Sequence, residues 1–141
     1  MTMVYLRRKY RFCSAHRYHN PKFDAAENER RFGKCGYEHG HGHNYELEVV
    51  IGPAVPDHDT GMIFDLGDLD EIVRRLVIEP FDHHHLNHDV PYFADVIPTT
   101  EEICRYVFGL LDGALPAKLL HGVVLREDPD LAAECYRSDE R

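Results

Sequence analysis

A strictly alternating segment in the first half of the chain constrains its fold most. Every second residue from Tyr45 to Ile51 is apolar, whereas residues 44, 46 and 48 are polar. Successive side chains on a β-strand point to opposite faces, so this period of two predicts a half-buried strand. Gly52-Pro53 is expected to end the strand, because both residues disrupt regular strand geometry. The chain is therefore expected to contain a sheet with one face against a core.

Two other segments have the three-to-four-residue spacing of amphipathic helices. From Leu66 onward, apolar residues recur at positions 66, 69, 72, 73 and 76, and Pro80 is expected to end this helix. The second helix is expected to begin at Thr99 or Thr100, since either hydroxyl can cap it. Thr99 and Glu102 have the spacing of a capping box.

The remaining patterned segments are expected to be strands. Val4–Ala15 predicts a first strand, and Gly122–Glu127 and Ala133–Arg137 predict a C-terminal hairpin. The polar segment 18–33 is expected to be a loop that contains no more than a short helical turn. The order strand, strand, helix, helix, strand, strand favours an α+β fold, with a four-stranded antiparallel sheet and two helices on one face. Open sheet edges favour self-association, because pairing between copies covers them.

Length, charge and cysteine content exclude several classes of protein. The chain, residues 1–141, is long enough for one domain with its own core. Its 16 basic and 25 acidic residues give a net charge of −9, which disfavours binding to nucleic acid or anionic membranes. We find no run that could span a bilayer, no signal peptide and no disulfide-like cysteine spacing. A cytoplasmic protein with free thiols is expected.

Histidines are concentrated just before the alternating strand. His39, His41 and His43 are each two residues apart. Residues i and i+2 of a strand share a face, so His41 and His43 can direct two imidazoles at one metal ion. Zinc requires about four ligands, and a catalytic zinc site leaves one position for water or substrate. We expect the third ligand to be His16, at the end of the first strand, with His39 as the local alternative.

Three other features can supply chemistry. Cys35 lies beside Lys34 in a glycine-rich segment before the histidines, where a cation and a metal would favour its thiolate. Asp82 begins a second histidine cluster, in which a carboxylate–imidazole pair suits proton transfer better than a second metal site. The sequence does not distinguish among the histidines at 83–85 as its partner. Glu127, at a strand end, can accept two hydrogen bonds from an amino-pyrimidine edge.

Together these motifs resemble the 6-pyruvoyl-tetrahydropterin synthase family, which includes the 6-carboxy-tetrahydropterin synthases. The resemblance covers almost the whole chain. Each motif is short, but their order and spacing are specific. The matching segments are Phe12–His16, Gly33–Cys35, His41–Tyr45, Gly61–Asp65, Asp82–His83 with Leu86–Asn87, Pro98–Glu101 and Glu127.

The resemblance implies an assembly and a metal centre. The implied fold is the T-fold (tunnelling fold), in which α+β subunits join their sheets into a barrel, typically as a homohexamer of two trimers. A catalytic Zn²⁺ would be held by His16, His41 and His43, which leaves His39 outside the ligand set. The active sites would lie at interfaces between subunits.

The resemblance also implies roles for the other candidates. Cys35 would be the general base, and Asp82 and His83 would form its partner dyad. In this family a neighbouring subunit can supply both the dyad and the cysteine. Glu127 would anchor the pterin ring of a small-molecule substrate. The residues that would assist it, at the start of the second helix, are Thr99, Thr100 and Glu101.

The implied reaction removes triphosphate from 7,8-dihydroneopterin triphosphate and yields 6-pyruvoyl-tetrahydropterin, a step of tetrahydrobiopterin biosynthesis. The alternative yields 6-carboxy-tetrahydropterin with acetaldehyde and triphosphate, as in queuosine biosynthesis. Five residues separate Cys35 from His41, a spacing that resembles the pyruvoyl-forming members of the family, whereas counting to His39 gives three. The basic residues that are candidates for binding the triphosphate are Arg17, Arg30, Arg31 and Lys34.

Two readings without catalysis remain as alternatives. A metal- or pterin-binding module would need neither Cys35 nor the Asp82–His83 pair. A structural zinc protein would need four protein ligands, whereas three are matched here.

Overall fold

The computed structural model describes residues 1–138 and confirms an α+β fold. The strands are β1 (Val4–His16), β2 (His41–Ala54), β3 (His84–His85), β4 (Leu120–Asp128) and β5 (Leu131–Tyr136). The helices are α1 (Ala25–Phe32), α2 (Leu66–Val73), α3 (Glu79–Phe81), α4 (Leu86–Asp89) and α5 (Thr100–Ala114). Shorter helical turns cover Gly33–Gly36 and Pro91–Ala94, and a π-helical turn covers Arg74–Ile78.

The sheet has five strands in the order β3-β1-β2-β4-β5. The four long strands are antiparallel neighbours, as expected. The prediction of a purely antiparallel four-stranded sheet is wrong, because β3 pairs in parallel with Ser14 and Ala15 of β1. A two-residue strand is too short to have a detectable period, so only the fold could reveal it.

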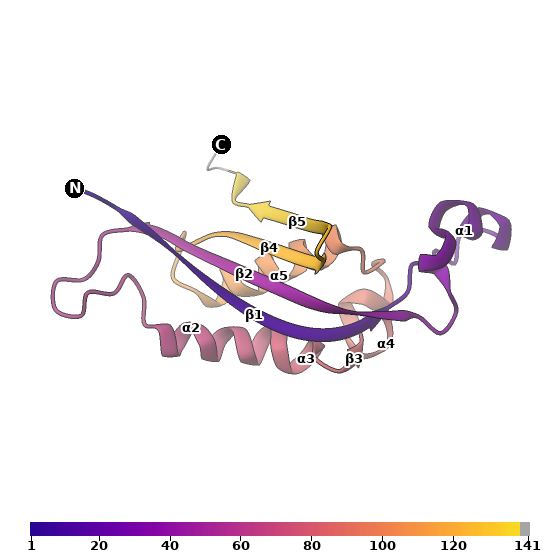
Figure 1. The fold of residues 1–141 in the computed structure, drawn as a ribbon, viewed down its shortest axis with the longest axis horizontal. Helices are drawn as coiled ribbons and strands as arrows, with labels where there is room; N and C mark the ends of the chain where they lie inside the picture. Colours follow the sequence, from indigo (N-terminus) through magenta and orange to yellow (C-terminus); the bar gives the residue numbers. More distant parts are fainter. Residues whose placement is uncertain (139–141) are drawn as a thin grey trace.

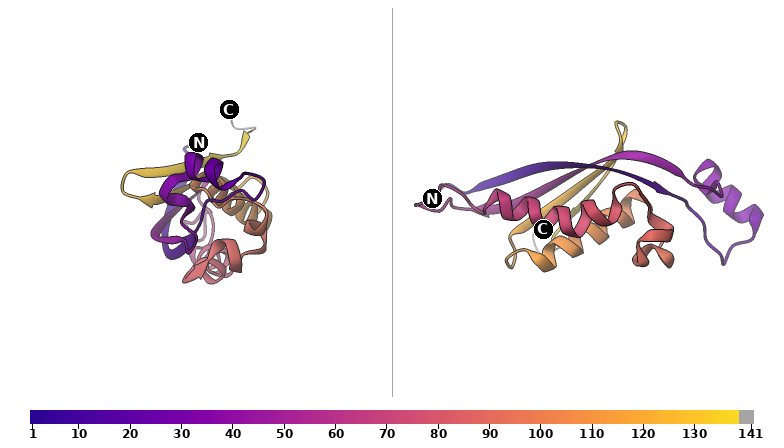
Figure 2. Two further views of the ribbon diagram at one scale, coloured as in Figure 1. Left: turned by 90° about the vertical axis from the view of Figure 1, so that its right-hand side faces the viewer. Right: turned by 90° about the horizontal axis from the view of Figure 1, so that it is seen from below.

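The core lies between the sheet and the helices on one of its faces. Tyr45, Leu47, Val49 and Ile51 are all fully buried, which confirms the alternation predicted for this strand. Figures 1 and 2 show α2 and α5 together on this face, while α1 projects beyond the far end of β1 and β2. No helix within residues 1–138 combines the length and apolar character needed to cross a membrane.

The segment 18–33 is more ordered than the loop predicted for it. Its second half forms α1, whose first turn is capped by the Asp24 carboxylate, which accepts a hydrogen bond from the Glu27 amide. The buried Asn28 side chain amide donates to three carbonyls at the start of the helix, those of Asn20, Phe23 and Asp24. Side-chain bonds to the backbone, rather than apolar periodicity, therefore define this element.

Two proline positions also differ from expectation. The cis Gly52-Pro53 bond lies within β2, which continues to Ala54 instead of ending at Gly52. Pro80 does not end the first long helix, because the π-helical turn after α2 places it in the first turn of α3. A proline is tolerated there, since a first-turn residue needs no intrahelical N–H bond.

The start of α5 fixes one wall of the candidate site, and its cap is testable. The Thr99 hydroxyl accepts a hydrogen bond from the Glu102 amide at 3.1 Å, which identifies Thr99 as the cap. Replacing Thr99 with alanine should lower the free energy of unfolding by about 1 kcal/mol in urea titrations. Thr99→Ser keeps an accepting hydroxyl and should stay near the wild type; equal losses in both variants would contradict the cap.

Candidate functional site

Three histidines converge at the end of the sheet nearest α1. The register of β1 and β2 places His16 opposite His41, and His43 opposite the buried Ser14. All three side chains therefore lie on the same face of the sheet. The Nε2 atoms of His16 and His41 are 3.1 Å apart, and one ring nitrogen from each of the three histidines lies within 4.8 Å of the others.

His16 is the most strongly constrained of the three. It has no solvent exposure, and its Nδ1 lies 2.8 Å from the Pro98 carbonyl, to which it donates in the neutral tautomer that leaves Nε2 free. Burial, with a smaller contribution from the nearby His41 and His43, lowers the pKa of His16 to about 4. At neutral pH the ring is therefore uncharged, which is the form that binds a metal.

The donor set of this cluster fits a transition metal. Among residues 1–138, Nδ1 of His41 and Nε2 of His43 are buried without a hydrogen-bond partner. Buried polar atoms are usually paired, so unpaired imidazole nitrogens grouped with a third ring nitrogen are suited to hold a metal ion. Three neutral imidazoles are typical ligands of Zn²⁺ and of similar divalent metals. His39 is exposed and packs on Tyr37, outside the cluster.

Glu127 brings a carboxylate to the edge of the histidine cluster. It is 8% exposed, and its Oε1 lies 3.5 Å from Nε2 of His16 and 3.7 Å from Nε2 of His43. The same oxygen accepts a hydrogen bond from the Thr100 hydroxyl at 3.1 Å. The carboxylate thus lies between the histidines and the start of α5, where Glu101 is exposed.

The second histidine cluster contains a distinct acid–base pair. Nδ1 of His83 lies 2.9 Å from Oδ2 of Asp82, whereas His84 and His85 form β3. The other Asp82 oxygen accepts the Cys13 amide at 2.8 Å, which holds the pKa of Asp82 below its usual range. The His83 side chain is 81% exposed, so this pair lies on the surface of the single chain.

Cys35 lies in the turn Gly33–Gly36 that follows α1. The Cys35 carbonyl accepts the Tyr18 amide at 2.8 Å, and the Arg17 Nε donates to the Gly36 carbonyl at 3.1 Å. Both contacts tie the turn to the residues directly after His16. The half-buried Cys35 is thereby anchored to the strand end that carries the histidines.

Comparison with known proteins identifies the family. The model of the family described as 6-pyruvoyl tetrahydropterin synthase matches residues 5–138. This chain belongs to that family. A 6-pyruvoyl tetrahydrobiopterin synthase from Poecilia reticulata is 39% identical over 123 residues, which cover 87% of this chain and 83% of the relative.

The solved structures agree with this family membership. The Caenorhabditis elegans 6-pyruvoyl tetrahydropterin synthase superposes with a TM-score of 0.91 at 34% identity, covering 98% of both chains. A putative 6-carboxy-5,6,7,8-tetrahydropterin synthase from Archaeoglobus fulgidus is also 39% identical, but over 89 residues, 63% of this chain and 69% of the relative. The match to the pyruvoyl-named relatives of the family is therefore the more extensive one.

One residue of the site was missed at the sequence level. The Tyr18 ring lies edge-on to His16, with ring centroids 5.2 Å apart. Burial, with the Glu127 carboxylate as the next cause, raises the pKa of Tyr18 to about 12. Its position two residues after His16 was the available signal, since i and i+2 side chains leave a strand on one side.

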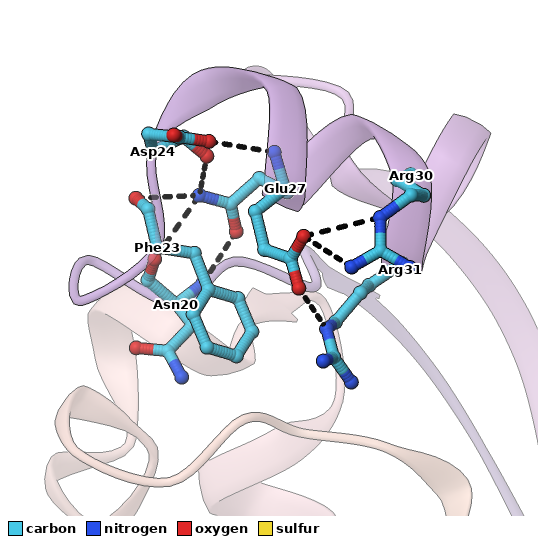
Figure 3. A network of polar contacts seen from close by, with 7 residues as sticks. Asn20, Phe23, Asp24, Glu27, Arg30 and Arg31 are labelled. Carbon is cyan, nitrogen blue, oxygen red and sulfur yellow. Dashed lines mark hydrogen bonds and ion pairs between the residues drawn. The ribbon is translucent and has the colours of Figure 1, made fainter.

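The structure separates the four basic residues proposed for the triphosphate. Figure 3 shows that Arg30 and Arg31 both form ion pairs with Glu27. Arg17 uses its Nε to hold the Gly36 carbonyl. Lys34 is exposed, and no side chain within residues 1–138 forms an ion pair with it. Its ammonium group is thus free to meet an anion beside Cys35.

Proposed function

We propose that this chain is a zinc-dependent lyase that eliminates triphosphate from 7,8-dihydroneopterin triphosphate to form 6-pyruvoyl-tetrahydropterin. The observation that carries the proposal is the convergence of three histidine nitrogens beside the Glu127–Thr100 pair. Membership of the 6-pyruvoyl tetrahydropterin synthase family supplies the substrate and reaction class.

His16, His41 and His43 would hold the zinc ion. When bound, zinc supplies Lewis acidity that makes a C–H group beside the substrate's side-chain hydroxyls easier to deprotonate. The chain contributes orientation: the Pro98 carbonyl holds the His16 ring, so its Nε2 is already directed at the other two histidines. Because His16 is uncharged at neutral pH, no proton has to leave it first.

Cys35 and the Asp82–His83 pair move the protons. The Cys35 thiolate removes the proton from the side-chain carbon while triphosphate departs. Asp82 holds the His83 ring through Nδ1, so the other ring nitrogen can exchange protons with the side-chain oxygens during tautomerisation. Neither group is needed for binding alone, so their presence favours an enzyme over a metal- or pterin-binding module.

Glu127 recognises the pterin ring. Its carboxylate is acceptor-only when ionised, and two of its lone pairs match the two N–H groups on an amino-pyrimidine edge. Thr100 fixes one carboxylate oxygen, and Thr99 fixes the start of α5 from which Thr100 and Glu101 project. Two charge-assisted hydrogen bonds to one edge give orientation as well as affinity.

The active enzyme is a homo-oligomer, a hexamer of two trimers whose sheets form a barrel. Within residues 1–138, β5 pairs only with β4, and β1 meets β3 at only Ser14 and Ala15, which leaves two sheet edges open. Such edges are usually covered, and pairing between copies would cover both. The exposed His83 is then available to the site of a neighbouring copy.

Product identification tests the proposed reaction. Protein loaded with zinc is incubated with 7,8-dihydroneopterin triphosphate, and the products are identified by mass. The 6-pyruvoyl product with free triphosphate is expected. The 6-carboxy product with acetaldehyde would instead assign the chemistry named for the Archaeoglobus relative. If wild-type protein releases no triphosphate, the lyase proposal is wrong.

Lys34 should contribute to affinity for the triphosphate group. Lys34→Met removes a free cation near Cys35 and should raise KM about ten-fold, the lower end of the range for one hydrogen bond to a charged group. Arg30→Met removes a cation already paired with Glu27 and should leave KM near the wild-type value. Steady-state kinetics of triphosphate release measure both. If Arg30→Met raises KM more than Lys34→Met does, Lys34 is not the main cation that binds the triphosphate.

A further inference from the structure

The segment that carries the Asp82–His83 pair is held against β1 by the backbone of Cys13. The Cys13 amide donates to Oδ1 of Asp82 at 2.8 Å, and the His83 amide donates to the Cys13 carbonyl at 2.6 Å. Directly after the pair, β3 continues the contact with β1. The position of the acid–base pair therefore depends on how its segment is fixed to this strand.

The backbone of His83 has an uncommon conformation. Its φ is +61°, in the left-handed region that favours glycine. A histidine keeps such a conformation only where its surroundings determine it. In this conformation Nδ1 of His83 lies 2.9 Å from Oδ2 of Asp82, while its amide remains bonded to Cys13. A loosely held segment would lose this geometry first.

Ser14 adds a side-chain bond at the residue before the pair. Phe81 is the last residue of α3, and the last carbonyls of a helix lack an intrahelical donor. The Ser14 hydroxyl donates to the Phe81 carbonyl oxygen at 2.5 Å. Both residues are buried, so this oxygen would otherwise be a buried acceptor in need of a partner.

The bond from Ser14 controls the direction of the chain as it enters the pair. The Phe81 ring packs edge-on to Phe12 in the core, with ring centroids 5.6 Å apart, and this contact fixes where Phe81 lies. The Phe81 carbonyl and the Asp82 amide belong to one planar peptide group. A hydrogen bond to that carbonyl therefore fixes the plane from which Asp82 begins.

We propose that Ser14 is a positioning residue that orients the Asp82–His83 pair for proton transfer. The inference rests on the proposed function, in which this pair moves protons. Ser14 acts on the pair within its own chain, so the role is the same whether the pair serves this chain's site or that of a neighbouring copy. Because the Ser14 hydroxyl is occupied by Phe81, its loss should reduce kcat and leave KM unchanged.

Ser14→Ala tests this directly, because the two backbone bonds of Cys13 remain. With zinc-loaded protein, kcat for triphosphate release should fall about ten-fold, a part of the hundredfold or more that an acid–base group contributes. KM and zinc content should stay at wild-type values. A wild-type kcat, or a loss confined to KM, would overturn the proposal. So would loss of zinc, since Ser14 would then support the metal site instead.

A double-mutant cycle with His83→Ala separates this role from general damage. Once the His83 ring is gone, adding Ser14→Ala should lower kcat little further, because Ser14 acts only through the pair. If the two losses in kcat multiply, Ser14 acts independently of the pair and the proposal is wrong.

Tyr10→Phe is the matched control, since it also removes one hydroxyl from the same face of β1. The Tyr10 hydroxyl donates to Oδ1 of Asp70 on α2 at 2.6 Å, and not to the segment of the pair. The variant should keep wild-type kcat; a loss equal to that of Ser14→Ala would contradict the proposal. If wild-type protein releases no triphosphate, the proposed function fails too, whereas a fully active Ser14→Ala protein overturns this inference alone.

Discussion

Replacing Cys35 with alanine will lower kcat for triphosphate release by at least about a hundredfold, the usual contribution of a general base. The variant should still bind one metal ion per chain, because the three histidines come from β1 and β2 and not from the Cys35 turn. Triphosphate release and metal content of the purified protein are the two measurements.

The control for Cys35 is another cysteine of similar exposure. Cys135 is also half-buried but lies on β5, so Cys135→Ala should keep near-wild-type turnover. If Cys35→Ala releases triphosphate as fast as wild type, Cys35 is not the base. The alternative of a metal- or pterin-binding module would then be favoured. A protein that loses its metal as well would mean that the Cys35 turn supports the histidine site.

Replacing His16 with alanine should remove the metal and the activity together. His16 is fully buried and directs Nε2 at His41, so its loss leaves two histidines, too few for a stable zinc site. We expect zinc affinity to fall by more than about a hundredfold. Loss of only a hydrogen-bond partner of a metal-bound histidine already costs up to about a hundredfold, and here the ligand itself is lost. Zinc titration against a competing chelator measures this change.

His39 provides the matched control for His16. It belongs to the same histidine-rich segment, but it is exposed and packs on Tyr37. His39→Ala should keep wild-type zinc affinity and turnover. If His39→Ala loses zinc while His16→Ala keeps it, the ligand set is wrong and the local alternative holds.

The parts of the fold with a regular apolar period were predictable. The buried face of β2 follows the alternation at Tyr45–Ile51, and the hydroxyl of Thr99 caps α5 as its capping-box spacing indicates. Helix α1 could not be predicted from apolar periodicity, because its start depends on hydrogen bonds between the side chains of Asp24 and Asn28 and the backbone. The position of Pro80 depended on a π-helical turn, which has no simple sequence signal.

The candidate site was partly predictable for a similar reason. Residues two apart on a strand lie on the same face, so the shared face of His41 and His43 could be predicted from the sequence alone. The residues alone did not distinguish His83 from its two neighbours; the family resemblance named it, and the fold places its Nδ1 2.9 Å from Oδ2 of Asp82. Tyr18 required the fold, since its ring contact with His16 depends on how the chain turns after β1.

The metal dependence of triphosphate release tests the central claim most directly. Protein stripped with a chelator is dialysed, divided, and assayed with 7,8-dihydroneopterin triphosphate before and after addition of one equivalent of Zn²⁺. We predict negligible release by the stripped protein and recovery of release with one zinc per chain. Undiminished release by stripped protein would contradict the account, because the histidine cluster would then have no part in the reaction.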